Sequence, residues 1–439
     1  MYDVRQDPQL VERALLVAVE HAGRPTNETE SLLEELEELV ANIGVGVVDA
    51  VAIKARKPNP KYLIGVGQAA DVMKLARAHN CDVIIFDEEL TPAQQRNWEA
   101  EAKMLVIDRQ EVIIDIFASR AQTKEAKLQV DLARMEYSLP RLRRAWTHLS
   151  RQRGGAATQR GEGETQLEID QRLVRTRIAR LKRELEQVIQ HRKVQRAKRS
   201  KIPMPSAALI GYTNAGKSSL LNHMTESDVL EEDKVFATLD PTSKRLELPS
   251  GQTSILTDTV GFVRKLPHRL VDAFKATLEE AVIADMLIHV IDVSQPDLNP
   301  FINTTLNVLK ELNADENPRL LVFNKTDLLE DRERIQFLQG QYPEAIFTST
   351  KTGEGLEKLK EKLDEIFSES YRSVELVIPH SRYDLLTQLH ETGGITFKQA
   401  IGEGTYVTGC IPQRLEATVL PFKLGENAND IRAQLKNFA

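Results

Sequence analysis

The chain has 439 residues, of which 41% are hydrophobic and 28% charged, and these proportions are ordinary for a globular protein. Its two cysteines, Cys81 and Cys410, exclude a disulfide framework and indicate a reducing compartment. A polar start without a signal peptide, and apolar runs no longer than strands, predict a cytoplasmic protein with no stable membrane insertion. The length favours about three or four domains.

The net charge of −7 conceals one basic segment. Residues 111–201 hold 22 Lys and Arg against 11 Asp and Glu, whereas the remainder holds 36 against 54. An acidic protein with one basic segment is a candidate for binding a polyanion through it, although charged helices that only face water give the same count.

Residues 1–110 are predicted to form an N-terminal α/β domain. Short apolar runs at residues 15–19 and 83–86 are typical of buried strands. Asn27, with a glutamate three residues later, predicts the start of a helix, and Pro92 predicts another. Residues 65–67, Gly-Val-Gly, are interpreted as a plain turn, and whether this domain binds a second nucleotide such as ATP stays open.

Residues 111–200 are predicted to form an antiparallel helical hairpin. Hydrophobic residues step by four and three positions through two stretches, as in coiled-coil seams. Pro140 interrupts the first stretch and should kink or restart its helix. A glycine-rich loop joins the stretches and carries Arg151, Arg153 and Arg160, which are candidates for polyanion contacts. The seam residues are Leu128, Leu132, Met135, Leu139, Leu142, Trp146 and Leu149, then Val174, Ile178, Leu181, Leu185 and Val188.

Residues 201–370 are predicted to form a P-loop GTPase domain, and residues 371–439 a small C-terminal α/β domain. A strand expected at residues 207–210 runs into a sequence that fits the phosphate-binding pattern G-x-x-x-x-G-K-S. Backbone N–H groups and the N-terminus of the next helix favour phosphate oxygens. Lys217 should neutralise the β- and γ-phosphates, and the Ser218 hydroxyl should bind Mg²⁺. The expected phosphate-binding residues are Gly211, Tyr212, Thr213, Asn214, Ala215, Gly216, Lys217, Ser218 and Ser219.

Two later segments are expected to reach the metal and the γ-phosphate. Asp258 follows a predicted strand and should hold Mg²⁺ directly or through water, while the backbone N–H of Gly261 should contact the γ-phosphate. Thr238 is the preferred second Mg²⁺ hydroxyl, with Thr242 as its rival. Lys217, Thr238 and Gly261 form the predicted catalytic set.

The guanine base is expected at two more motifs, Asn324-Lys325-Thr326-Asp327 and Ser349-Thr350-Lys351. The Asp327 carboxylate can accept from N1–H and the exocyclic amine of guanine, two donors that adenine does not offer together. Asn324 should tie this loop to the P-loop, and the stem of Lys325 should pack over the base. Ser349, Thr350 and Lys351 should close its other side, so GTP and GDP are the predicted ligands.

Phe262 follows Gly261 at the position where Ras-like enzymes carry the glutamine that positions the attacking water. Phenylalanine cannot make that hydrogen bond, so intrinsic hydrolysis should be slow and a partner should supply the missing group. Phe262 is also interpreted as an anchor that holds switch II on a hydrophobic neighbour, and the two interpretations are compatible.

Together these features resemble the HflX family of translational GTPases, which is related to the Obg group. The resemblance implies binding to the 50S subunit, splitting of 70S ribosomes, notably under heat stress, and hydrolysis stimulated by the ribosome. It implies that Arg151, Arg153 and Arg160 contact rRNA near the peptidyl-transferase centre, in a ribosome-associated protein, expected to be a monomer, that does not bind DNA. Besides the nucleotide motifs, it rests on residues 90–97, 126–130, 146–149, 163–168, 258–262 and 273–280.

Two other functions fit part of the pattern. A tRNA-modifying GTPase also places helices beside its GTPase domain, but usually ends in a reactive cysteine motif, whereas this chain ends Lys-Asn-Phe-Ala. A signalling GTPase that acts on a protein or membrane partner would not need a basic loop on a long arm.

Overall fold

The structure is a computed structural model, and its chain divides into two compact units. One unit comprises residues 1–189, 232–240 and 261–277, and the other comprises the rest. Among the described residues, no helix is long and apolar enough to cross a membrane. The described residues are 11–21, 26–55, 57–144, 166–199, 205–225, 236, 239–265, 281–329, 333–369, 371–391, 395–402, 404–412 and 415–424.

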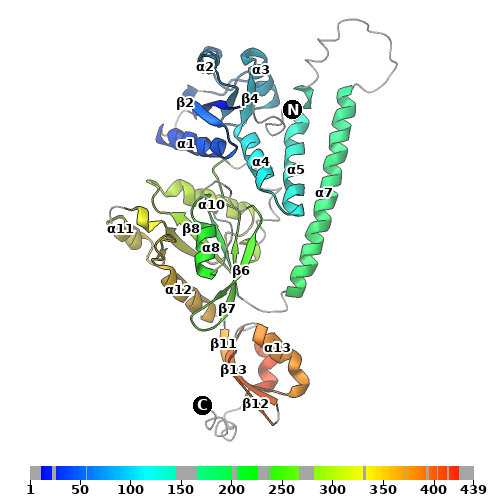
Figure 1. Ribbon diagram of the computed structural model, residues 1–439, viewed down its shortest axis with the longest axis vertical. Helices are drawn as coiled ribbons and strands as arrows, with labels where there is room; N and C mark the ends of the chain where they lie inside the picture. The colour runs from blue at the N-terminus through cyan, green and yellow to red at the C-terminus, as the bar shows by residue number, and fades with distance from the viewer. Residues whose placement is uncertain are drawn as a thin grey trace. The chain divides into compact units, whose positions relative to one another are not determined.

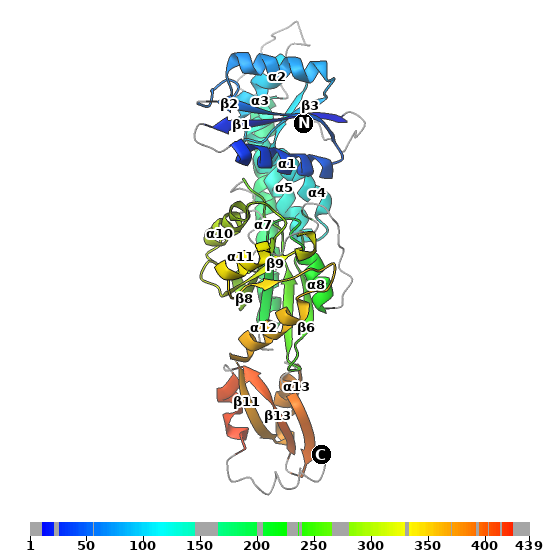
Figure 2. The same ribbon diagram turned by 90° about the vertical axis from the view of Figure 1, so that its left-hand side faces the viewer.

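The N-terminal α/β domain is a parallel sheet of order β2-β1-β3-β4 with helices on both faces. Figure 2 shows α1 and α2 on opposite faces of this sheet. Both strands expected from apolar runs are present, α3 begins at Pro92, and α1 begins one residue before Asn27. The elements are β1 (Arg13–His21), α1 (Thr26–Asn42), β2 (Gly46–Ala55), α2 (Val66–Ala78), β3 (Val83–Phe86), α3 (Pro92–Ala102) and β4 (Leu105–Asp108).

A capping box begins α3. The Thr91 hydroxyl accepts from the Gln94 backbone N–H at 3.2 Å, and Gln94 Oε1 accepts from the Thr91 N–H at 2.9 Å. Gln95 then donates to the Val106 carbonyl at 2.6 Å and accepts from Arg141 Nε at 2.9 Å. The segment at residues 90–97 therefore starts one helix and holds the root of the predicted hairpin.

The hairpin consists of α4 (Arg109–Arg120), α5 (Lys124–Ser138), the 3₁₀ segment η2 (Leu139–Arg144) and α7 (Gln166–Arg199). The helix ends just before Pro140, which confirms the predicted interruption. In Figure 1, α5 and α7 lie side by side. The tip residues Arg151, Arg153 and Arg160 lie outside the described residues. The seam joins Leu128, Leu132 and Met135 to Ile178, Leu181, Leu185 and Val188. Of the other predicted seam residues, Leu139, Leu142 and Val174 are not part of this cluster, and Trp146 and Leu149 lie outside the described residues.

Phe236 and Asp240, which lie on either side of the predicted metal ligand Thr238, contact the hairpin within the same compact unit. The rings of Phe236 and Phe117 meet edge to face, with centroids 4.4 Å apart. Asp240 accepts hydrogen bonds from the backbone N–H groups of Gln122 and Thr123 at 3.3 and 3.1 Å, and from the Thr123 hydroxyl. Its carboxylate therefore stabilises the N-terminus of α5, where a helix favours negative charge.

The GTPase domain is a six-stranded sheet of order β10-β9-β8-β5-β7-β6, parallel except for β6. From β5 the chain continues to β7 on one side and to β8 on the other, so the end of β5 is a topological switch point. The elements are β5 (Ser206–Gly211), α8 (Lys217–Thr225), β6 (Thr242–Glu247), β7 (Thr253–Asp258), β8 (Met286–Asp292), α10 (Asn299–Glu311), β9 (Arg319–Asn324), η3 (Thr326–Leu328), α11 (Glu333–Gln341), β10 (Ile346–Phe347) and α12 (Leu356–Glu369).

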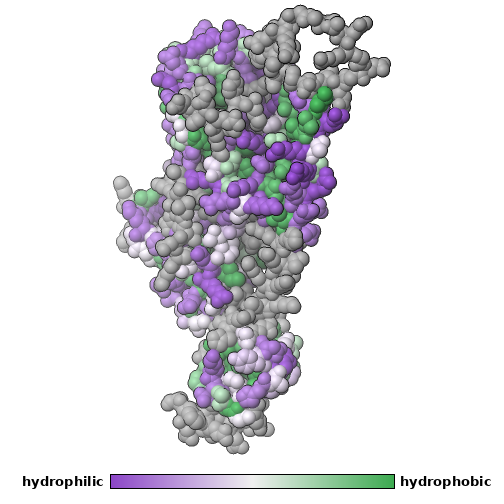
Figure 3. Space-filling view, turned by 45° about the vertical axis from the view of Figure 1, so that its right-hand side comes forward, coloured by the Kyte–Doolittle hydropathy of each residue, from purple (hydrophilic) through white to green (hydrophobic). Residues whose placement is uncertain are grey.

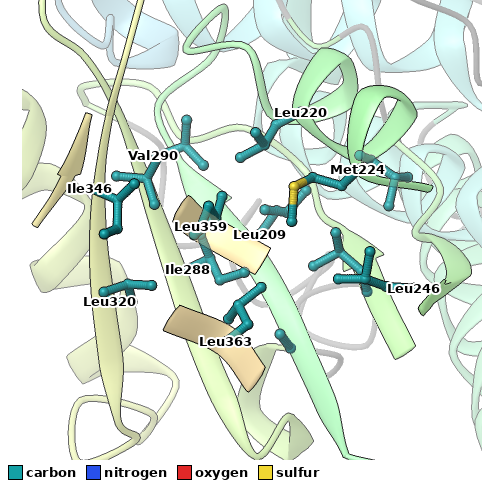
Figure 4. Close-up of a cluster of buried hydrophobic side chains, with 14 of the residues drawn as sticks. Leu209, Leu220, Met224, Leu246, Ile288, Val290, Leu320, Ile346, Leu359 and Leu363 are labelled. Carbon is teal, nitrogen blue, oxygen red and sulfur yellow. The ribbon is translucent and has the colours of Figure 1, made fainter. Parts of the chain in front are cut away.

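Side chains from all six strands of the sheet and from α8 and α12 form the core of this domain (Figure 4). The alternation of each strand sends every second residue, such as Ile288 and Val290 of β8, to the face covered by α8 and α12. The core anchors the start of α8, and hence the P-loop. It includes Leu209, Leu220, Met224, Leu246, Ile288, Val290, Leu320, Ile346, Leu359 and Leu363.

The C-terminal domain is a three-stranded antiparallel sheet of order β11-β13-β12 that packs against α13. Leu376, Val407 and Leu385 lie in its core. On the face drawn in Figure 3, apolar residues form separate patches among polar ones. The domain boundaries at residues 110, 200 and 370 stay predictions. The elements are β11 (Tyr371–Ile378), η4 (His380–Arg382), α13 (Tyr383–Glu391), β12 (Ile395–Ile401), β13 (Gly404–Pro412), α14 (Glu416–Val419) and η6 (Leu420–Phe422).

Candidate nucleotide-binding site

The predicted nucleotide motifs meet at the carboxyl edge of the GTPase sheet. Gly211, Asp258 and Asn324 are the last residues of β5, β7 and β9, and Ser349 lies two residues beyond β10. The carboxyl ends of parallel strands share one edge of a sheet, which is where open α/β folds bind ligands. The four segments are therefore brought together by the strand order itself.

The two glycines of the P-loop are required by close backbone approaches. A Cβ on Gly211, at φ +142°, would stand 2.2 Å from the Val290 carbonyl oxygen. A Cβ on Gly216, at φ +89°, would stand 2.3 Å from Asn324 Nδ2. Any side chain at either position would push the loop away from its neighbours, so the tight turn depends on glycine.

Lys217 begins α8 and is buried, with 6% of its surface exposed. Its Nζ donates to the Tyr212 carbonyl at 2.7 Å, which holds the ammonium inside the loop. Burial lowers its pKa to about 8; Asp258 opposes the shift, and Lys325 adds to it. A buried cation with a lowered pKa gains most from an anionic ligand.

Ser218 and Asp258 form a pair suited to a hard cation. The Ser218 hydroxyl donates to Asp258 Oδ2 at 2.7 Å, and Asp258 is fully buried. Mg²⁺ prefers oxygen ligands and commonly combines one or two carboxylates with phosphates and water. Among the described residues, no group of three or more His, Cys, Asp or Glu could hold a metal ion. The Ser218–Asp258 pair therefore fits a Mg²⁺ that also takes phosphate oxygens.

The remaining predicted metal and γ-phosphate residues are placed less directly. Thr238 lies outside the described residues, whereas its rival Thr242 stands opposite Asp258 in the β6–β7 ladder. Gly261 belongs to the other compact unit, so its contact with the γ-phosphate stays a prediction. Phe262 beside it is buried, with 1% of its surface exposed, which favours its interpretation as an anchor of switch II.

Asn324 joins the loops that are predicted to bind the base to the P-loop. Its Nδ2 donates to the Ala215 carbonyl at 3.0 Å, and this is the tie that the motif predicted. Its Oδ1 accepts from the Thr348 hydroxyl at 3.2 Å and from the Thr350 backbone N–H at 3.3 Å. The side chain is completely buried, so these three bonds replace the water that it lost.

Asp327 lies at the exposed edge of this arrangement. Its Oδ1 accepts from the Ser349 hydroxyl at 2.6 Å, which brings the last two motifs together. An exposed carboxylate beside a buried amide can accept hydrogen bonds from the edge of a planar base. Lys351 is exposed on the same loop as Ser349.

The sequence did not single out Asp292 and Thr348. Asp292 ends β8, and its Oδ2 lies 2.9 Å from the Nζ of Lys325, whose backbone is left-handed at φ 67°. Thr348 follows β10 and supports Asn324. The sequence could have indicated Asp292 by its position, because it is the last residue of an apolar strand, as Asp258 is.

Three family models match the chain: "GTP-binding GTPase N-terminal" over residues 30–118, "GTP-binding GTPase Middle Region" over residues 120–199, and "50S ribosome-binding GTPase" over residues 206–325.

Relatives match this chain over most of its length. "GTPase HflX" of Akkermansia muciniphila is 45% identical over 423 residues, covering 94% of this chain and 97% of the relative. "GTPase HflX" of Escherichia coli is 43% identical over 364 residues, covering 83% and 85%. A solved GTP-binding protein of Sulfolobus solfataricus in complex with GDP is 25% identical, with a TM-score of 0.42, over 82% of this chain and 99% of that one.

Proposed function

Because the chain belongs to the HflX family of GTPases, we propose that it hydrolyses GTP, binds the 50S ribosomal subunit and dissociates 70S ribosomes. The observation that carries the nucleotide part is the meeting of four guanine-nucleotide motifs at one sheet edge, joined through Asn324. The match to a family of 50S ribosome-binding GTPases supports the ribosomal part.

The P-loop binds the phosphates. Backbone N–H groups between Gly211 and Gly216 and the N-terminus of α8 face the anion, and Lys217 neutralises the β- and γ-phosphates. Burial removes competing water, so the charge of Lys217 interacts more strongly with the phosphates than it would in water. The Gly261 N–H adds a contact that only a triphosphate offers.

Ser218 and Asp258 would hold Mg²⁺, with Thr238 or Thr242 as a further hydroxyl. The metal, when bound, neutralises charge on the β- and γ-phosphates. The Ser218 hydroxyl already points at the Asp258 carboxylate, so the two ligands need little reordering.

Asp327 selects guanine over adenine. A carboxylate that accepts two hydrogen bonds from guanine would face an adenine with no matching pair of donors, and leaving it unsatisfied is costly. Lys325 covers the base, and Ser349, Thr350 and Lys351 close its other side.

Intrinsic hydrolysis is slow because Phe262 cannot position water, and the ribosome supplies or rearranges the missing group. The hairpin carries the RNA contacts. Arg151, Arg153 and Arg160 at its tip bind rRNA, and the seam between α5 and α7 braces the two helices that the tip loop joins. The protein acts in the cytoplasm as a ribosome-associated monomer.

Co-sedimentation with purified 50S and 70S particles, in GTP or GDP, tests the function. We expect binding to 50S in the presence of GTP, and conversion of 70S particles into subunits. Binding to tRNA with no binding to either particle would instead favour a tRNA-modifying GTPase. Binding to no RNA at all would favour a signalling switch.

A further inference from the structure

The segment that follows Gly261 ends in a charged pair, Arg264 and Lys265, which contacts carboxylates of the N-terminal domain. Arg264 Nε lies 2.6 Å from Glu35 Oε2, and its Nη2 donates to the Ser31 carbonyl and hydroxyl at 2.7 and 3.0 Å. Lys265 Nζ lies 2.8 Å from Glu88 Oε1 and is also bonded to Asp87. All of these residues belong to one compact unit.

These carboxylates form an acidic pocket, defined here as Glu35, Asp87 and Glu88. Asp87 and Glu88 directly follow β3, and Glu35 projects from α1. The chain leaves β1 toward β2 on one side and later returns to β3 on the other, so this carboxyl edge is also a switch point. The place where such a sheet takes a ligand is therefore filled by two cations of the same chain.

Burial makes these contacts strong. Asp87 and Glu35 are 2% and 8% exposed, and both also contact Arg109, which is 2% exposed. The charges are balanced, because the three carboxylates of the pocket face the three cations Arg109, Arg264 and Lys265. Removing one partner from a buried pair leaves a charge without compensation, so the pair resists release.

The residues between Gly261 and the charged pair are buried as well. Phe262 and Val263 are 1% and 0% exposed. The described part of switch II is thus ordered by apolar burial and by ion pairs to the N-terminal domain. In many GTPases the γ-phosphate itself must order this segment, at a cost in conformational entropy.

We propose that Arg264 and Lys265 are positioning residues: the acidic pocket holds the described part of switch II, residues 261–265, in one conformation before a nucleotide binds. This inference rests on the proposed binding of GTP and on the predicted contact between the Gly261 N–H and the γ-phosphate. The pocket lowers the entropic cost of binding GTP, whereas GDP offers Gly261 no γ-phosphate and gains nothing. The N-terminal domain therefore sets how strongly the protein prefers GTP to GDP.

The test is the ratio of two dissociation constants, for a non-hydrolysable GTP analogue and for GDP, measured on the full chain without ribosomes. Lys265→Glu places a third carboxylate against Asp87 and Glu88 and expels the pair. We expect the dissociation constant for the GTP analogue, divided by that for GDP, to rise at least about fivefold. This is the lower end of typical coupling between sites. Glu88→Gln, at a partly exposed side chain, should change the ratio in the same direction and leave folding intact.

Charge exchange supplies the rescue. Adding Glu88→Lys to Lys265→Glu re-creates an ion pair at the same place and should return the ratio toward the wild-type value. Lys74→Ala is the matched control, because Lys74 is 77% exposed and its pair with Asp71 is on the surface. It should leave the ratio unchanged.

An unchanged ratio in both Lys265→Glu and Glu88→Gln, or a shift toward GTP, would overturn the inference; the latter would make the pocket an inhibitory lock. A predicted shift in a protein that fails to dissociate ribosomes would support the positioning role and count against the ribosomal function. The two proposals therefore fail in different experiments.

Discussion

At the scale of single residues, the candidate site depends on a few side chains that each serve two loops. Asn324 bonds the P-loop through Ala215 and the last motif through Thr350, and Gly216 must be glycine because Asn324 fills the space of its Cβ. The predicted base-binding loops and the P-loop are therefore mechanically linked through one amide.

Asp327→Asn should change base specificity from guanine to xanthine. The amide loses the carboxylate that accepts from the guanine amine, but can donate to the carbonyl that xanthine carries there. We expect GTP affinity to fall roughly 10- to 100-fold, as for a lost charged hydrogen bond, and XTP to bind better than GTP. Competition binding with GTP, XTP and ATP measures this.

Asp315→Asn, at an exposed carboxylate outside the nucleotide motifs, is the control for the loss of one charge. It should leave the order of affinities unchanged. If ATP competes with GTP equally in the wild-type protein, the assignment of base recognition to Asp327 is wrong.

Nucleotide binding should take up a proton at alkaline pH. Burial lowers the pKa of Lys217 to about 8, so above pH 8 much of the free protein carries a neutral lysine. A bound triphosphate favours the ammonium, and the lysine is protonated on binding. Uptake should therefore be larger at pH 9 than at pH 7.5, and affinity should fall by at most about tenfold per pH unit above pH 8.

Calorimetry in two buffers of different ionisation enthalpy measures the uptake directly. In Lys217→Ala the pH-dependent uptake should disappear, and hydrolysis should fall by about 100-fold or more. Equal uptake at the two pH values in the wild-type protein would contradict the role of Lys217 as the titrating cation.

At the scale of elements, a buried polar cluster ties the root of the hairpin to the N-terminal domain. Tyr137 of α5 donates to Asp108 and Glu111 at 3.0 and 3.2 Å, and Arg141 of η2 lies over the Tyr137 ring and donates to the Leu90 carbonyl at 2.7 Å. Burial, then the charges of Asp108 and Asp115, raises the pKa of Glu111 to about 7.

Glu111→Gln should stabilise the folded protein at neutral and alkaline pH. Because the folded pKa is raised from 4.5, ionising Glu111 costs stability as pH rises from about 4.5 to 7, and the full cost remains above pH 7. The gain should be roughly 1 to 3 kcal/mol at pH 8 and should vanish near pH 4.5. Thermal unfolding of both proteins across this range measures it.

Glu101→Gln, at an exposed carboxylate of α3, controls for a general loss of negative charge. A gain that is independent of pH, or equal in the two variants, would show that Glu111 is not the titrating group.

The hairpin also shows what sequence patterns can predict. The part of the seam that joins α5 to α7 and the break at Pro140 follow from local periodicity and ring geometry, and both are present. The attachment of Arg264 to Glu35 joins residues 229 positions apart and leaves no periodic trace. Likewise, Asp292 could be placed at a strand end, but its pairing with Lys325 depends on loop geometry that spacing does not specify.

At the scale of the whole molecule, the tip loop should deliver the protein's action to rRNA. Replacing Arg151, Arg153 and Arg160 together by glutamate should leave nucleotide binding intact, weaken 50S binding and abolish 70S dissociation. Phosphate contacts make binding steeply salt-dependent, and the variant should lose part of that dependence. Light scattering of 70S particles with GTP compares the two proteins.

A control with the same change of charge replaces Arg175, Arg177 and Arg183, which are exposed along α7, by glutamate. It should retain most of the dissociation. If the tip variant splits ribosomes as well as the wild type, the hairpin is only a spacer. If the control variant loses splitting to the same extent, the net charge of the hairpin, and not the position of the tip arginines, determines splitting.

The four-part architecture follows from the sequence because each part has its own motif or periodicity. The division into two compact units does not follow, because residues 232–240 and 261–277 join the earlier part of the chain. That assignment depends on contacts such as Phe117 with Phe236, which only the folded chain brings together.

The cap that Asp240 places on α5 also has a consequence for the order of folding. The carboxylate arrives 117 residues after Thr123, about 6 to 23 s later at a synthesis rate of roughly 5–20 residues per second. Until then the first turn of α5 lacks its negative partner, and the acidic pocket lacks Arg264 and Lys265, which come later still. The N-terminal part therefore cannot complete its contacts before β5 and β7 have left the ribosome, and the motifs that begin at Asn324 and Ser349 emerge later still. In each newly made molecule, the N-terminal part can therefore be complete before the whole nucleotide site is.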